Sequence, residues 1–191
     1  VVLRVVELTA EHHPGAFAHA PSDGWLPAHT AMRFQVKHPH VALRVLDLSA
    51  EHHPRAFAHP LPRGSLALHV ALRYQSKQPE VVLRVAELTA LHNSAGFGAA
   101  AVLRGVPAPD HPLLHLLDAE NMLPVHIAIA VHGGGMAGSD ARLPRDVVDK
   151  VAELTREHFP TAFDAEAEQR RGWRGAGLEE LLAAGLAAGA V

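Results

Sequence analysis

Residues 1–19 read VVLRVVELTAEHHPGAFAH, and the pattern returns at residues 41–59 as VALRVLDLSAEHHPRAFAH. It recurs as VVLRVAELTALHNSAGFG from Val81 and as VVDKVAELTREHFPTAFD from Val147. The first three copies start 40 residues apart. Because self-similarity at a fixed period of roughly 20–50 residues is the signature of a repeat architecture, this stretch decides the fold class.

A second motif lies between these copies and reads GWLPAHTAMRF from Gly24, GSLALHVALRY from Gly64 and NMLPVHIAIAV from Asn121. Its first two histidines, His29 and His69, are again 40 residues apart, whereas His126 follows His69 by 57 residues. We therefore expect insertions near residues 98–112 and 133–143, which delay the later copies without changing their register.

The motifs predict two helices in each unit. The Leu-Pro steps at Pro27 and Pro124 suit the first position of a short helix, where the missing N–H costs nothing. The longer helix has Val41, Val45 and Leu48 at positions i, i+4 and i+7, and it ends before Pro54 because proline cannot continue a helix. We therefore expect an all-α protein.

Three further positions recur. A glycine or asparagine precedes each short helix and fits a turn with a positive φ angle: Gly24, Gly64 and Asn121. A large aromatic residue follows each long helix and predicts an anchor that packs the loop onto the helices: Phe17, Phe57, Phe97 and Phe163. Arginines three residues before a carboxylate, such as Arg4 before Glu7, predict weak ion pairs on a solvated helix face.

The second motif resembles the opening of the ankyrin repeat, in DGWLPAHTA from Asp23, LALHVA from Leu66 and LPVHIA from Leu123. The long helix is similar to the family's second helix, in EVVLRV from Glu80 and DVV from Asp146. The likeness covers about residues 1–164 and implies a solenoid of stacked helix-turn-helix repeats that binds protein partners. The chain departs from the family in its 40-residue period, in leucine where threonine is usual, and in lacking the glycine that ends the long helix. Another α-hairpin solenoid, of the tetratricopeptide or HEAT kind, is the alternative.

The expected organisation is a repeat array over residues 1–164. It comprises a partial repeat at 1–23, repeats at 24–63, 64–120 and 121–164, a linker at 165–177 and a short helix at 178–191. Val1 falls at the start of a long helix, so we expect the sequence to be part of a longer chain. We also expect a monomer, in an intracellular, cytoplasmic setting.

Composition removes several classes of function. A net charge of −3 argues against nucleic acid as a partner. The absence of cysteine excludes a thiolate nucleophile and a zinc–thiolate site. No apolar run approaches the roughly 18–20 residues that cross a membrane. We expect no catalysis and no cofactor.

The sixteen histidines raise the alternative of a metal-binding protein. However, one set of them occupies a single repeat position: His12, His52, His92 and His158. Neighbouring helices lie roughly 8–10 Å apart, whereas zinc–nitrogen bonds are about 2 Å long, so this set favours packing over ligation. For His29, His69 and His126, the resemblance implies hydrogen bonds to the turn backbone.

The predicted partner-binding residues lie on the short helices and at a turn tip: Trp25, Arg33, Phe34, Arg73 and Tyr74. Arginine and aromatic residues are enriched among binding hot spots. Two alternatives remain at this point. Phe34 and Tyr74 could cover the core of the next repeat, or the whole array could act as a passive spacer in a larger chain.

Overall fold

The computed structural model describes residues 2–100, 122–133, 142–164 and 177–188. Over these ranges the protein is all-helical and contains no strand, as the sequence predicts for an all-α chain. None of the helices described there is both long enough and apolar enough to cross a membrane. Most of both insertions and of the expected linker, together with Asn121, lies outside the described residues.

The helices fall into two length classes. The short ones are α2 (Pro27–Phe34), α4 (Ala67–Tyr74) and α6 (Pro124–His132). The long ones are α1 (Val2–His12), α3 (Pro39–His52), α5 (Pro79–His92) and α7 (Arg145–His158). Each long helix is followed by a 3-10 turn: η1 (Pro14–Ala18), η2 (Pro54–Phe57), η3 (Ser94–Gly98) and η5 (Pro160–Phe163).

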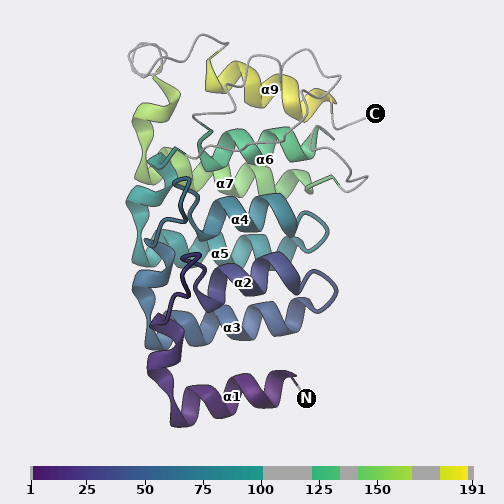
Figure 1. The fold of residues 1–191 in the computed structure, drawn as a ribbon. Coiled ribbons are helices and arrows are strands. Elements are labelled where there is room, and N and C mark those ends of the chain that lie inside the picture. The colour runs from purple at the N-terminus through teal and green to yellow at the C-terminus, as the bar shows by residue number, and fades with distance from the viewer. Residues whose placement is uncertain (1, 101–121, 134–141, 165–176, 189–191) are drawn as a thin grey trace.

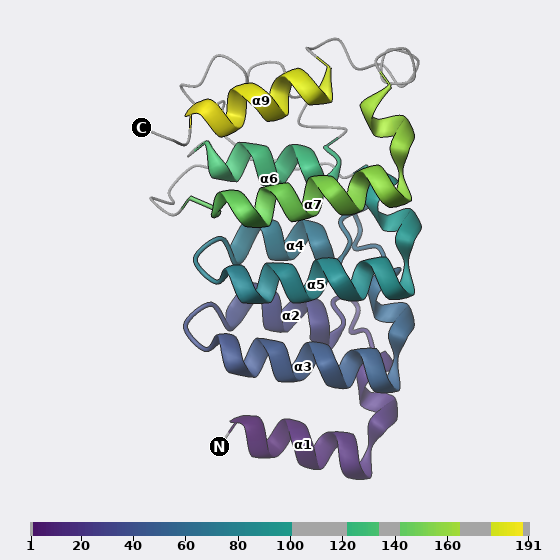
Figure 2. The ribbon, with the colours of Figure 1, turned by 180° about the vertical axis from the view of Figure 1, so that it is seen from behind.

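Helices of the two classes form two layers (Figures 1 and 2). Each short helix packs against the long helix that follows it, and the pairs α2/α3, α4/α5 and α6/α7 stack in chain order. We call such a pair with its 3-10 turn a unit. At the C-terminal end, α9 (Leu178–Ala188) lies on α6 and falls within the expected C-terminal helix. The two termini lie at opposite ends of the stack.

Local sequence signals account for where the helices begin. Pro27 and Pro124 occupy the first turn of their short helices, as predicted. Pro39 and Pro79 do the same for α3 and α5, so these long helices begin earlier than the repeated apolar pattern suggests. The turns before α2 and α4 contain Gly24 and Gly64 with φ angles of 78° and 77°, which confirms the prediction of positive φ.

The recurring phenylalanines are buried anchors, and they also join successive units. The side chains of Phe57 and Phe97 are completely buried, and Phe17 is nearly so, as predicted. Each lies against the histidine that ends the next long helix, with ring centroids 5.7 to 5.8 Å apart: Phe17 with His52, Phe57 with His92 and Phe97 with His158. The repeated histidine position is therefore a contact between units.

The arginines of the long helices also connect units, which corrects the expectation of pairs within one helix alone. Arg84 donates from Nε and Nη2 to Asp47 Oδ1 of the preceding unit, at 2.9 and 2.8 Å. Its contact with Glu87 in its own helix is longer, at 3.4 Å. Arg44 lies 3.7 Å from Glu7. A carboxylate one unit back is in reach because neighbouring long helices run side by side.

Buried amides add a third link between units. Gln75, which follows α4, is fully buried and donates from Nε2 to the carbonyl of Met32 at 2.5 Å. Gln78 donates to the carbonyl of Val36 at 3.1 Å. These bonds satisfy carbonyls at and beyond the C-terminal end of α2, which the helix itself leaves without a donor.

The helix α1 has no short helix packed on it in the described structure. Val5 is 57% exposed, whereas the equivalent Val45 of α3 is 6% exposed. Leu8 and Leu48 show the same contrast, at 36% and 3%. The apolar opening of the sequence therefore presents a surface that α3, α5 and α7 bury against short helices.

Candidate binding groove

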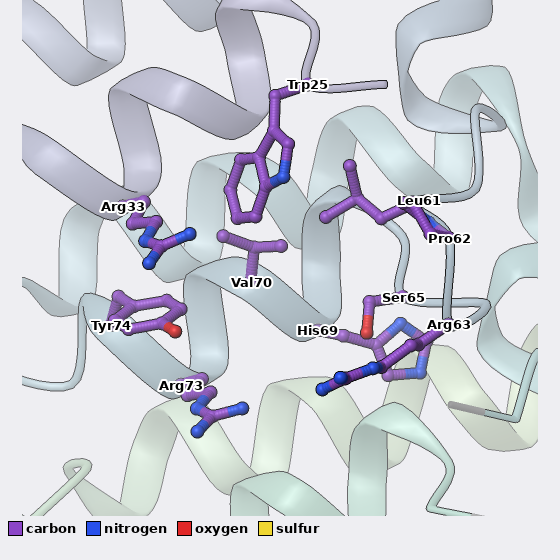
Figure 3. A pocket seen from close by; sticks show the side chains of 10 residues that line it. All are labelled: Trp25, Arg33, Leu61, Pro62, Arg63, Ser65, His69, Val70, Arg73 and Tyr74. Atoms are coloured by element: carbon purple, nitrogen blue, oxygen red, sulfur yellow. The ribbon is translucent and has the colours of Figure 1, made fainter. Parts of the chain in front are cut away.

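A groove of about 340 Å³ lies beside the short helices, where the first complete unit meets the second (Figure 3). Trp25 and Arg33 line it from the first of these units. The second contributes His69, Val70, Arg73 and Tyr74 from α4. The intervening turn contributes Leu61, Pro62, Arg63 and Ser65. We call this feature the arginine groove.

Four of the five predicted partner-binding residues line the arginine groove: Trp25, Arg33, Arg73 and Tyr74. Phe34 is not among the lining residues, but its ring lies 5.1 Å from Arg33 Cζ. Phe34 is 64% exposed, so the alternative that it covers the next repeat's core is wrong. For Tyr74 that alternative holds in part, because its half-buried ring packs on the main core while also lining the groove.

Arg33 is held by aromatic rings. Its Cζ atom lies 4.9 Å from the ring centroid of Trp25, 5.1 Å from that of Phe34 and 5.8 Å from that of Tyr74. All three distances fall within the roughly 6 Å at which a guanidinium is attracted to an aromatic face. Arg73 lies 5.4 Å from the Tyr74 ring. The rings therefore restrict two cations without neutralising their charge.

The groove has three cations and no carboxylate among its lining residues. Arg33, Arg63 and Arg73 all line it. In the ranges that the structure describes, none of these three forms an ion pair. The arginines of the long helices, by contrast, pair with carboxylates: Arg4, Arg44, Arg84, Arg145 and Arg156.

The base of the groove is apolar and closely packed. Leu61 and Val70 are almost fully buried in the core beneath it. Figure 3 shows Val70 between the Trp25 ring and the α4 side chains, with Leu61 and Pro62 on the turn opposite Arg33. An apolar base with polar groups converging from its rim is the usual form of a ligand site.

His69 shapes this turn and carries no charge at neutral pH. Its Nδ1 accepts the N–H of Leu66 at 3.1 Å, so the proton is on Nε2, which donates to the carbonyl of Ala99 at 3.0 Å. Burial lowers the pKa of His69 to about 4, although hydrogen bonds to the carbonyls of Ala99 and Met122 oppose the shift. The neutral ring therefore fastens the start of α4 to a loop of the following unit.

The other two histidines of this motif differ from each other. His126 Nδ1 accepts the N–H of Leu123 at 3.2 Å, so the expected bond to the turn backbone is confirmed there and at His69. It is wrong for His29, whose two ring nitrogens have no hydrogen-bond partner within the described structure. Burial, and secondarily the charge of His59, lowers the pKa of His29 to about 4.

No three His, Asp or Glu side chains come close enough together to hold a metal ion, as far as the described ranges extend. His52, His92 and His158 lie against phenylalanine rings instead.

Sequence reasoning missed Arg63 and the turn around it. The available signal was a substitution at one repeat position, since Arg63 before Gly64 stands where the preceding unit has Asp23 before Gly24. The carboxylate of Asp23 accepts the N–H of Trp25 at 3.1 Å and so serves its own turn. An arginine cannot accept that bond. The exchange therefore adds a cation to the groove side of the turn.

Comparisons with protein-family models, with curated proteins and with solved structures find no match to this chain.

Proposed function

We propose that this chain is a protein-interaction scaffold, an ankyrin-like solenoid that binds a partner in the arginine groove and carries out no catalysis. Support for the ankyrin-like part comes from the paired antiparallel helices, the positive-φ glycines and the histidine bonds to the turn backbone. The turn before α4 is closed by bonds from Leu61 N to Ser65 O and from Gly64 N to Leu61 O, both 2.9 Å. The 40-residue period and the 3-10 turns set the units apart from ordinary members of that family.

The observation that carries the proposal is the convergence of unpaired cations and aromatic rings on one groove. Interfaces are enriched in tryptophan, tyrosine and arginine because these side chains bring a large contact area and several donors to one place. Trp25 and Tyr74 are only half-buried, and both line the groove with Arg33 and Arg73. None of these side chains closes a contact between long helices.

The test compares captured partners rather than counting them. The whole chain is immobilised beside the double variant Arg33→Ala/Arg73→Ala and a control, Arg44→Ala/Arg84→Ala, which removes the same charge from the long helices. We expect proteins retained by the parent and the control, in a saturable manner, to be lost from the groove variant. Circular dichroism must show equal helix content in all three chains.

Two outcomes would overturn the proposal. Equal retention of the same proteins by the groove variant would remove the groove from the interaction. No saturable binding by any of the three chains would favour the passive spacer considered above.

A further inference from the structure

Resting on the proposed function, we infer that the arginine groove takes an acidic peptide segment of the partner, with one apolar side chain flanked by carboxylates. The apolar side chain sits on Val70 and Leu61. The carboxylates meet Arg33, Arg73 and Arg63 at the rim.

Charge is the first argument. The groove gathers three guanidinium groups and no lining carboxylate, within a chain whose net charge is −3. Acidic side chains elsewhere are engaged with the arginines of the long helices, as Asp47 and Glu7 are. The groove is thus a local cationic site on an otherwise slightly acidic protein, and opposite charge on the partner steers and orients binding.

Geometry is the second argument. The rings around Arg33 and the Tyr74 ring beside Arg73 limit the rotamers of both cations. Holding a side chain in place before binding lowers the entropy that binding costs. A planar guanidinium matches a carboxylate with two parallel N–H donors, which a lysine cannot do. The groove arginines are therefore arranged for carboxylates more than for a diffuse anion.

The shape of the groove limits what can enter. Figure 3 shows Arg33, Tyr74 and Arg73 along one side and the turn with Leu61 and Arg63 along the other. A volume of about 340 Å³ lies at the small end of the range for ligand sites, roughly 300–1,000 Å³. One or two side chains of an extended segment fit this space, whereas a docked helix would need a longer trough.

A nucleic acid is the competing anion, and the aromatic residues argue against it. Single strands bind proteins by stacking bases on exposed aromatic faces along a positively charged groove. Here Arg33 already lies over the Trp25 ring and Arg73 lies over Tyr74. The faces that a base would need are occupied by cations of the protein itself.

Fluorescence anisotropy tests this inference with a labelled short peptide that carries a central leucine between runs of glutamate. We expect saturable binding to the whole chain that weakens as salt rises. Arg33→Gln and Arg73→Gln should each lower the affinity about tenfold, which is the loss of one strong charged contact. Arg63→Gln, on the exposed turn, gives the same reading if a helix variant fails to fold.

The control is Arg44→Gln/Arg84→Gln, which should leave the affinity within about twofold because those arginines lie on the long helices. Three results would overturn the inference: equal affinity for the peptide with glutamine in place of glutamate, equal loss in the control variant, or tighter binding of a single-stranded oligonucleotide at the same groove. If the peptide fails while Arg33→Ala/Arg73→Ala still loses its captured partners, the acidic-segment inference falls and the scaffold proposal stands.

Discussion

Arg84 on α5 and Arg73 on α4 belong to the same unit and have opposite surroundings. Arg84 contacts Asp47 at 2.8 Å and Glu87 at 3.4 Å, whereas Arg73 lies beside the Tyr74 ring and pairs with no carboxylate among the described residues. Phe57 and Phe34 repeat the contrast, since one is fully buried between units and the other is exposed. The comparison separates a long-helix side that holds the stack together from a short-helix side that is open to a partner.

The largest expected effect comes from the two phenylalanines. Phe57→Ala should lower the free energy of unfolding by about 3–5 kcal/mol, because it empties a fully buried site and removes the ring under His92. Phe34→Ala should change it by no more than about 0.5 kcal/mol. Urea unfolding followed by circular dichroism measures both, and equal losses would break the division into two sides.

The next largest effect is a dependence on pH from the buried histidines. His29 and His69 have folded-state pKa values of about 4 against an ordinary 6.5, so the unfolded chain binds protons first as the pH falls. Their stabilising effect is fully present above pH 6.5 and is lost between pH 6.5 and about 4. Each should contribute roughly 3 kcal/mol to that loss.

Urea unfolding at intervals from pH 7.5 to pH 4 tests this window (values chosen to bracket the two pKa values). His69→Gln should remove its share of the slope even though the variant starts from a lower stability. A slope unchanged in His69→Gln would mean that other groups carry the acid sensitivity.

A smaller effect is expected from the amide link between units. Gln75→Ala should cost about 1–3 kcal/mol, because it leaves the buried carbonyl of Met32 without its donor. Gln35 occupies the same position one unit earlier, and its side chain forms no hydrogen bond in the described structure. Gln35→Ala is therefore the matched control, and a loss as large as that of Gln75→Ala would assign the effect to helix propensity.

The smallest effect separates the arginines themselves. Arg84→Gln should cost up to about 1 kcal/mol, since its ion pair with Asp47 is half-exposed and partly screened. Arg73→Gln should leave the free energy of unfolding unchanged within about 0.5 kcal/mol. Thermal unfolding of both variants at low and high salt sharpens the comparison, because only the Arg84 difference should shrink as salt rises.

The helical units could be predicted because their signals are local. Proline at a helix start, glycine at positive φ and apolar spacing along α3 each depend on a few neighbouring residues. Four groove residues were also predictable, since Trp25 and the arginine–aromatic pairs recur on the short helices. The contacts between units were not, because Arg84 chooses between Glu87 and Asp47 only when the stacking distance is known.

The spacing of the Phe–His contacts bears on how the length of this chain can vary. Because the contact positions recur every 40 residues, excising residues 41–80 would bring His92 opposite Phe17 and Arg84 opposite Glu7. Both partners are chemically what the new neighbour requires. The stack is thus tolerant of gain or loss of a whole period, while a deletion of any other length would misalign every contact beyond it.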